Sequence, residues 1–437
     1  MKESIKISFK TTCKELRTFL ALWSTQSLSQ LGSSMTAFAL TLWLYEKTGS
    51  ALQTALLSIC TYAPYVMMSI FAGALSDRWD KKKVMLVCDT LAAGSTLVVF
   101  VLLKEDLLAP EHLYLLNVLN GLMNTLQQPA GDVAMTLIIP KKHYQKTSGM
   151  RSFSNSLITI LNPVLATTLY SLFGMNLVIA VDLGTFAVAF LTLLFGVRLP
   201  KIRNRNHEER ESLLLSARSG LVFLKENSLV FTLILFLAGV NLVASAFDAV
   251  LPALILPSPQ GGEMALGLVT STAGVAMLIG SLLATFMRKP KDRVRVIYLT
   301  MLVSLSMENF LLAFTRTPVL WCLGQLIGWL PVPIMNANLD VILRASIPVE
   351  MQGRVYSCRN TLQFFTIPVG FFLGGFLVDQ VCEPLMAQAA MDGGLVRLFG
   401  AGKGSGAAMV MFLLGTVGTL ICLMFGQVLK KYHYDKI

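Results

Sequence analysis

Charge is scarce in this sequence. Only 14% of its 437 residues are Asp, Glu, Lys or Arg, whereas 54% are hydrophobic. Soluble domains carry about 25% charged residues, so the composition argues against a soluble fold and indicates an integral membrane protein. The net charge of +11 does not point to nucleic acid, because no soluble stretch is long enough to form a basic domain.

Residues that mark catalytic or metal centres are also few. The seven cysteines stand singly, without the C-x-x-C spacing of metal and redox sites. All four histidines fall outside the apolar stretches, so a proton relay inside the membrane would need carboxylates. The sequence contains no G-x-x-x-x-G-K-[ST] loop and no filter-like segment, which disfavours an ATP-driven pump and an ion channel. We therefore expect no enzyme, no cofactor, no metal site and no nucleic-acid partner.

Long apolar stretches, in contrast, are abundant. A bilayer core of about 30 Å requires about 20 apolar helical residues. The stretches are continuous rather than alternating, so they predict helices and not the strands of a barrel. We expect an all-α integral membrane fold with twelve transmembrane helices, at residues 18–45, 50–76, 84–103, 113–140, 152–170, 176–198, 229–255, 265–287, 296–315, 318–343, 360–378 and 407–429.

The placement of lysine and arginine supports this number of spans. With an even number, both termini share one side of the membrane, and basic loops alternate with loops that carry few basic residues. All but five of the 36 lysines and arginines lie in the termini and the even-numbered connections. The pattern predicts cytoplasmic N- and C-termini. The first apolar run is too long for a cleaved signal peptide and is expected to be the first span.

The longest cytoplasmic connection, residues 200–228, divides the predicted spans into two groups of six. We expect an N-terminal half at 1–199 and a C-terminal half at 229–437. Within the connection, the apolar spacing of 213–224 allows an amphipathic helix on the membrane surface, although a plain tether explains it nearly as well.

A dense group of charges, "GALSDRWDKKKVML", separates the second span from the third at residues 73–86. Gly73 would let another helix approach closely, and Asp77 would suit a helix N-terminus or a basic partner. The lysines at 81–83 would hold the turn on the cytoplasmic side. A turn that only sets topology explains the same residues equally well.

This segment resembles the signature of the major facilitator superfamily, G-x-L-x-D-R-x-G-R-K-x. Asp80 stands where most members have Gly, a departure shared with bacterial macrolide-efflux and related drug exporters. That branch is also similar at "EKTGSALQTALLS" (46–58), "QQPA" (127–130) and "IPVEMQGRVYS" (347–357). The residues that match the signature in register are Gly73, Leu75, Asp77, Arg78, Lys81 and Lys82.

The resemblance implies two pseudosymmetric six-helix halves that open a central cavity to each side in turn. It also implies a cytoplasmic gate that includes Gly353 and Arg354. In this gate, Asp77 latches the outward-facing state against the second half near Arg354, Arg359 and the start of span 11. Asp89 lies about 9 Å beyond Lys83 along a helix and is expected to support this gate. In the second half, "GSLLATFMRKPKDRV" (280–294) keeps the glycine and the basic turn but lacks the matching aspartate.

Acidic residues within spans are the candidates for proton coupling, because a charge at the bilayer centre costs about 2.5–3.5 kcal/mol. Asp182 and Glu308 lie toward the outer ends of their spans, where solvation is possible. Asp132 and Asp248 have no basic neighbour in sequence, whereas Asp340 has Arg344 one turn away. We therefore consider Asp132, Asp248 and Asp340 for this role, with hydrogen-bonded structural glue as the alternative.

Two departures from the family pattern bear on proton coupling. Drug antiporters of this family commonly carry an arginine in span 4 where this sequence has Asn120. Of their G-P-x-x-G-G element in span 5, only Pro163 is kept. Proton antiport is thus implied by the resemblance but not secured by these residues.

The resemblance further implies that spans 1, 4, 7 and 10 line the cavity. A wall of amides without fixed charge suits a neutral or cationic amphiphilic molecule, although amides also bridge helices. Two prolines, Pro331 and Pro333, are expected to bend span 10. The candidate cavity residues are Gln26, Gln30, Gln127, Gln128, Asn241, Asn336 and Asn338.

Together these features predict a secondary-active, proton-coupled exporter of hydrophobic or amphiphilic small molecules. We expect a monomer in a bacterial cell membrane, with protons, substrate and lipid as its partners. An uptake symporter or lipid-type carrier of the same fold is the first alternative. A membrane sensor or scaffold without turnover is the second.

Overall fold

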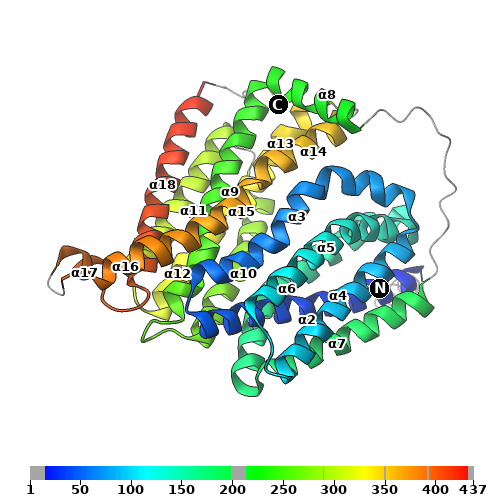
Figure 1. The fold of residues 1–437 in the computed structure, drawn as a ribbon. Coiled ribbons are helices and arrows are strands. Elements are labelled where there is room, and N and C mark those ends of the chain that lie inside the picture. The colour runs from blue at the N-terminus through cyan, green and yellow to red at the C-terminus, as the bar shows by residue number, and fades with distance from the viewer. Residues whose placement is uncertain (1–14, 198–212, 289, 349–350, 391–392, 432–437) are drawn as a thin grey trace, which may run out of the picture. The chain divides into compact units, whose positions relative to one another are not determined.

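The computed structural model consists of helices joined by short links, with no strand among the residues it describes (Figure 1). Most links are too short for anything but a turn, which is typical of successive membrane helices. The described residues are 15–197, 213–288, 290–348, 351–390 and 393–431, and the side chains of 69–78, 141, 145, 213–218, 352–353 and 357 are also outside the description.

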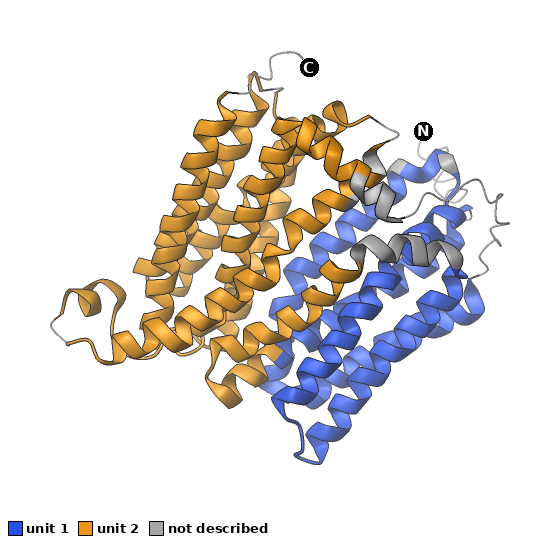
Figure 2. Cartoon of the chain, turned by 45° about the horizontal axis from the view of Figure 1, so that its top comes forward, with its two compact units in different colours: residues 1–40, 71–209 blue, residues 41–70, 210–437 orange. Residues whose placement is uncertain are grey.

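The chain forms two compact units, residues 1–40 with 71–209 and residues 41–70 with 210–437 (Figure 2). The boundary runs through two helices, α2 (Arg17–Thr48) and α3 (Ala51–Arg78). The predicted halves, 1–199 and 229–437, remain a prediction. Of the predicted linker, residues 200–212 lie outside the described residues.

Unit 1 holds the rest of the helices up to residue 197. In it α4 packs against both α5 and α7. The helix α7 continues into a short π-helical segment, η2. The bounds are α4 (Lys81–Lys104), α5 (Pro110–Ile138), η1 (Lys141–His143), α6 (Tyr144–Phe173), α7 (Met175–Leu191) and η2 (Thr192–Gly196).

Unit 2 is built around α9 and α11, which both pack against α18, while α9 also packs along α15. A helix is present at the predicted place as α8, whereas its position on the membrane surface and the linker itself stay predictions. The bounds are α8 (Leu213–Glu226), α9 (Ser228–Ile255), α10 (Glu263–Phe286), α11 (Arg293–Phe314), α12 (Pro318–Trp329), α13 (Pro331–Ser346), α14 (Gln352–Phe364), α15 (Thr366–Phe376), η4 (Leu377–Cys382), α16 (Glu383–Ala387), α17 (Gly394–Phe399) and α18 (Ser405–Leu429).

Ten helices among the described residues are long and apolar enough to cross a bilayer. The predicted spans 1 and 4, which correspond to α2 and α5, are not among them. Their length is ample, since the 32 residues of α2 extend about 48 Å. Their serine, threonine, asparagine and glutamine content lowers their hydropathy instead. The all-helical membrane fold is confirmed, whereas the number of twelve spans stays a prediction.

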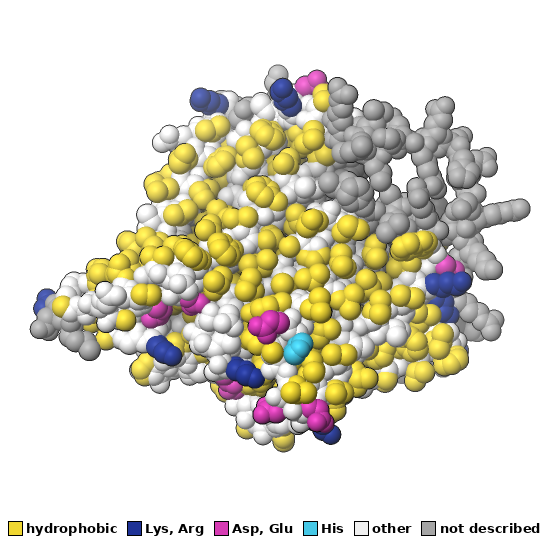
Figure 3. All heavy atoms as spheres, viewed as in Figure 1, with side chains coloured by type: hydrophobic (Ala, Val, Ile, Leu, Met, Phe, Trp, Pro, Cys, Tyr) yellow, Lys and Arg dark blue, Asp and Glu magenta, His cyan; other side chains and the backbone are white. Residues whose placement is uncertain are grey.

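The surface of the molecule agrees with a bilayer environment. Hydrophobic side chains cover most of the described part of the face in Figure 3, and charged side chains are few there. Phe286 is 83% exposed and Phe195 77% exposed. Exposing such large apolar side chains to water would be costly, so these helices face lipid.

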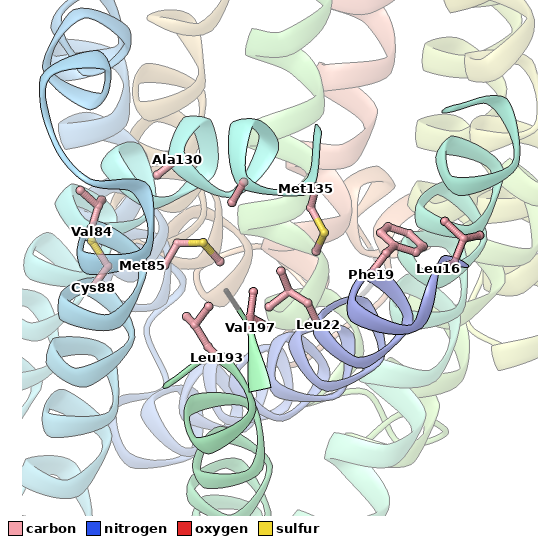
Figure 4. Close-up of a cluster of buried hydrophobic side chains, with 11 residues drawn as sticks. Leu16, Phe19, Leu22, Val84, Met85, Cys88, Ala130, Met135, Leu193 and Val197 are labelled. Atoms are coloured by element: carbon pink, nitrogen blue, oxygen red, sulfur yellow. The ribbon is translucent and has the colours of Figure 1, made fainter. Parts of the chain in front are cut away.

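The core of unit 1 forms where α2, α4, α5 and the end of α7 converge (Figure 4). Phe19 and Leu22 from α2 meet Met85 and Cys88 from α4, and Leu193 closes the cluster from η2. All five side chains are almost completely buried. This cluster holds together the first turns of α4 and the start of α2.

The predicted disturbance of span 10 is observed as a break at Leu330, between α12 and α13, directly before Pro331. Proline lacks an N–H group and removes a helical hydrogen bond. Gly280 on α10 packs against this point, since a Cβ there would lie 2.2 Å from the Leu330 carbonyl oxygen. The glycine therefore allows α10 to approach the interrupted backbone.

A glycine in unit 1 makes an equally tight contact and yields a test of the packing. A Cβ on Gly32 of α2 would lie 2.4 Å from the Thr185 hydroxyl and 3.0 Å from the Asp182 Cα atom of α7. We expect Gly32→Ala to destabilise the protein by about 1–3 kcal/mol through overpacking. Thermal unfolding in detergent measures this effect.

The matched control is Gly94→Ala on α4, where nothing lies within 4 Å of an added Cβ. Alanine there is expected to be neutral or stabilising by up to about 1 kcal/mol, because it favours the helix. Equal stability of the two variants would contradict the close α2–α7 contact.

Candidate functional site

Part of the predicted gate motif lies beyond the described side chains. Gly73, Leu75, Asp77 and Arg78 belong to the last turns of α3, but their side chains are outside the described residues. The same applies to Gly353. The latch predicted for Asp77 therefore stays a prediction.

The next residues of the motif organise the start of α4. The Asp80 side chain accepts a hydrogen bond from the Lys83 backbone N–H at 3.0 Å and so caps the helix. Asp292 does the same for α11, accepting from the Arg295 N–H at 2.9 Å. Both Asp and Gly are favourable N-cap residues, which gives a physical reason why this chain can have Asp where the signature that it resembles has Gly.

Lys82 joins this turn to another helix. Its ammonium group donates to the carbonyl oxygens of Leu194 at 2.9 Å and Val197 at 2.7 Å. These carbonyls lie at the C-terminal end of η2, where a cation is favourable. Lys81, its neighbour, is only 6% exposed. The lysines of the motif thus have structural partners in addition to any effect on topology.

Asp89 forms a three-helix cluster with two candidate cavity residues. Its carboxylate accepts a hydrogen bond from the Gln26 amide of α2 at 3.3 Å and another from the Gln127 amide of α5. No lysine, arginine or histidine among the described residues pairs with it within 4.0 Å. The structure therefore brings Asp89 together with the glutamines predicted to line the cavity.

The other candidate cavity residues divide into two groups. The Asn241 amide donates to the Gln363 carbonyl oxygen at 3.1 Å, and the Asn338 amide oxygen accepts from Arg293 at 2.9 Å. These two amides bridge helices, which is the alternative left open by the sequence. Three others have exposed side chains, and their part in a substrate site stays a prediction: Gln30, Gln128 and Asn336.

Asp132 differs from the expectation that it lacks a basic partner. Its carboxylate forms an ion pair with Arg151 of α6, and both side chains are about half exposed. The partner is 19 residues away in sequence, so inspecting nearby residues missed it. The expectation of an unpaired carboxylate was therefore wrong. A role for Asp132 in proton coupling stays a prediction.

The remaining coupling candidates belong to unit 2. Asp248 on α9 is exposed and lies close enough to Tyr62 of α3 to act on it electrostatically. Asp340 on α13 is also exposed and forms no ion pair with Arg344 within 4.0 Å in the described structure, although it acts on Arg359 of α14. The helical pair expected for Asp340 is thus absent.

Two acids whose sequence positions allow solvation are buried instead. Asp182 is 3% exposed and accepts from the Ser33 hydroxyl at 2.9 Å and the Thr96 hydroxyl at 3.4 Å. Glu308 is 5% exposed, and its Oε1 atom has no hydrogen-bond partner among the described residues. Distance along a span does not reveal how closely neighbouring helices cover a residue, so the sequence could not predict this burial.

Asp379 is a polar centre that the sequence reading missed. From η4 it accepts hydrogen bonds from the Ser50 hydroxyl at 2.5 Å, the Ala51 N–H at 3.0 Å and the Leu52 N–H at 2.9 Å. It therefore caps α3 from a distant part of the chain, and its negative charge lies at the positive end of that helix. The S-x-x-Q pattern at 50–53 is typical of a capping box and marks the start of α3, where the Gln53 N–H donates to the Ser50 hydroxyl at 3.0 Å. This pattern indicates the helix start but not Asp379 as its distant partner.

Near the chain start, Glu15 bridges to the turn between α5 and α6. It contacts the Lys142 ammonium and His143 Nε2, each at 2.7 Å. Hydrogen bonds from Lys142 and His143 lower the pKa of the Glu15 carboxyl below its ordinary value. The carboxyl is exposed, so this bridge positions a surface turn and contributes little to stability.

Arg354 lies on α14, where α8 packs. Its guanidinium donates to the Ser219 hydroxyl at 3.5 Å, and a Cβ on Gly220 would lie 2.8 Å from the Arg354 carbonyl oxygen. Gly220 thus allows α8 to approach α14 closely. Among the described residues, no three His, Cys, Asp or Glu side chains gather as ligands for a metal ion.

A known protein family matches the sequence of this helical chain. Residues 22–289, more than half of the chain, match the model of the Major Facilitator Superfamily. The chain belongs to the major facilitator superfamily. The resemblance carried by the motif at 73–86 is confirmed, and this member of the superfamily is a membrane transporter rather than an enzyme.

Individual relatives point in the same direction. Macrolide efflux protein A of Streptococcus pyogenes is 25% identical over 83% of this chain and 90% of that protein. Multidrug efflux pump Tap of Mycolicibacterium fortuitum is 23% identical over 80% of this chain and 86% of that protein. The likeness to the macrolide-efflux branch is thereby confirmed.

Solved structures support the fold. A transporter of the POT family, in complex with 5-aminolevulinic acid, superposes with a TM-score of 0.71 at 13% identity, over 95% of this chain and 96% of that chain. At 13% identity, this similarity shows the fold alone and says nothing about the substrate of this chain.

The cap on α4 can be tested directly in this transporter. Asp80→Ala removes the hydrogen bond to the Lys83 N–H and is expected to cost about 1 kcal/mol, whereas Asp80→Gly costs only a few tenths. Asp80→Asn keeps an acceptor and serves as the matched control. Thermal unfolding in detergent should rank Asn, Gly and Ala in that order, and an Ala variant as stable as the Asn variant would contradict the capping role.

Proposed function

We propose that this protein is a secondary-active exporter of amphiphilic small molecules, neutral or cationic, driven by the entry of protons. The observation that carries the proposal is the cluster of Asp89, Gln26 and Gln127. A carboxylate without a cationic partner, held by amides from α2 and α5, offers a negative site to a positively charged or hydrogen-bonding molecule.

The surroundings of this cluster suit an amphiphilic molecule. Trp23 lies one helical turn before Gln26 on α2, and its ring stacks with Phe19 at a centroid distance of 6.2 Å. An indole offers apolar surface and attracts cations. The glutamines lie on α2 and α5. These two helices are also the predicted spans that are absent from the ten helices apolar enough to cross a bilayer. Polar groups on otherwise apolar helices are typical of helices that line a solvated path.

The relatives support export as the direction. Their names describe efflux of macrolides and of several drugs. A third relative, from Escherichia coli, is named as an enterobactin exporter. For this chain, export of drug-like compounds is an inference from that similarity.

Transport in vesicles tests the proposal. The purified protein would be reconstituted in liposomes with an imposed pH gradient, and movement of ethidium and of a macrolide would be followed. Proton flux in the direction opposite to the substrate supports the exporter. Flux in the same direction supports an uptake symporter or lipid-type carrier, and binding without movement supports a sensor.

The role of Asp89 leads to a substrate-dependent prediction. Asp89→Asn removes the negative charge but keeps the side-chain shape. We expect transport of ethidium to fall by about tenfold, equivalent to about 1.4 kcal/mol, and transport of a neutral macrolide to fall less. The control is Asp106→Asn in the exposed link after α4. Equal losses for the two substrates would contradict recognition of positive charge by Asp89.

The gate motif leads to a second prediction. Asp77→Asn is expected to reduce transport to the level of protein-free liposomes, because the latch needs the carboxylate. Substrate binding and the yield of folded protein should stay unchanged. Full transport by this variant, measured beside Asp106→Asn, would rule out the gate role of Asp77.

A further inference from the structure

The carboxyl group of Glu308 occupies a niche formed by the neighbouring helix α12. A Cβ on Gly328 would lie 2.1 Å from Glu308 Oε2 and 2.3 Å from its Cδ atom, so a larger residue at 328 would force the carboxyl group to leave this position. Gly324, four residues earlier, would bring a Cβ within 2.3 Å of a Leu312 methyl group of α11. The two glycines form a G-x-x-x-G surface, which lets the helices α11 and α12 approach closely.

The polar partners in this niche do not satisfy a charged carboxylate. Glu308 is 5% exposed, and its buried Oε1 atom has no hydrogen-bond partner in the part of the chain that the structure describes. Among the described side chains, the Trp329 indole is the one placed to donate to the carboxyl group. Ser304, one turn earlier on α11, donates instead to the Gly328 carbonyl oxygen at 2.6 Å. One oxygen of the carboxyl group is thus left without a donor.

The charges around Glu308 are also unfavourable to an anion. The described residues of α9, α12, α13, α17 and α18, which pack against α11, bring no lysine, arginine or histidine within 4.0 Å of it, Arg397 of α17 included. The titratable group that acts on it electrostatically is Asp248 of α9, which has the same sign of charge. An unpaired buried charge beside a like charge is costly, and binding a proton removes that cost.

Glu308 contrasts with three other acids of the described helices, of which Asp182 is buried, Asp89 half-buried and Asp132 half-exposed. Asp182 accepts hydrogen bonds from two hydroxyl groups, and Asp89 from two amides. Asp132 has an arginine. Each of these carboxylates has partners that stabilise its charged form. The niche of Glu308 offers one donor and no cation, which favours the neutral carboxylic acid.

We propose that Glu308 is the residue that binds and releases the coupling proton during transport. This inference rests on the proposed proton-driven export and assigns its proton to a site in α11. One proton enters the niche to form the neutral carboxylic acid, and the same proton leaves when the niche opens to solvent.

Infrared spectroscopy of the purified protein tests the site without relying on transport. We expect the carbonyl stretching band of a buried, protonated carboxylic acid in the wild type at neutral pH. The band should be absent in Glu308→Gln and retained in Asp248→Asn. A band that persists in Glu308→Gln, or that is lost in Asp248→Asn instead, would overturn the assignment.

Transport measurements distinguish a failure of this inference from a failure of the proposed function. In liposomes, Glu308→Gln should reduce pH-driven transport of ethidium to the level of protein-free vesicles, while exchange of ethidium across the membrane without a pH gradient continues. The matched control is Glu105→Gln in the exposed link after α4, which should behave as the wild type.

If the wild type itself shows no pH-driven transport, the proposed function fails, and the infrared result alone decides whether Glu308 binds a proton. If the wild type transports and Glu308→Gln keeps full pH-driven transport, the inference fails while the proposed function stands. Should Glu308→Gln not fold, Glu308→Asp retains an acid. Its infrared band should then persist at a shifted frequency, and an unshifted band would contradict the assignment.

Discussion

The hydrocarbon core of a bilayer supplies no hydrogen-bond partners, and this constraint governs the polar groups of the structure. A donor, acceptor or charge within a span must find its partner inside the protein. Asp89 accepts hydrogen bonds from the amides of Gln26 and Gln127, and Asp182 accepts from the hydroxyl groups of Ser33 and Thr96. These contacts join elements far apart in sequence, so polar groups act as specific links between otherwise similar apolar helices.

The same constraint connects structure to transport. A carboxylate with several donors is stable as an anion and can hold helices together or face a cationic molecule, as Asp89 does with its two glutamines. A carboxyl group with too few donors changes its preferred protonation state when its surroundings change. Glu308 has that property because glycines shape its niche and a like charge lies nearby. The glycines that shape the niche therefore influence the protonation state of Glu308 as much as the acid itself does.

Sequence reasoning succeeded where local rules decide the outcome. Length and hydropathy predicted the helices, and the spacing of Gly73, Asp77 and Arg78 predicted the superfamily that the family model confirms. Pro331 predicted the disturbance of span 10, because a missing N–H acts within one turn. Sequence reasoning failed where a side chain has its partner on another helix. Arg151 pairs with Asp132, and Asp379 caps a helix more than 300 residues earlier.

By itself, the sequence determined an all-helical membrane protein with a charged turn before α4, because apolar length, scarce charge and proline positions act locally. Only the tertiary structure decided which acids have partners. Asp89 and Glu308 both lie in apolar helices and look alike in sequence, yet one meets two amides and the other meets a glycine surface. The physical reason is that the protonation and role of a buried carboxyl depend on atoms within a few ångströms, which helix packing brings together.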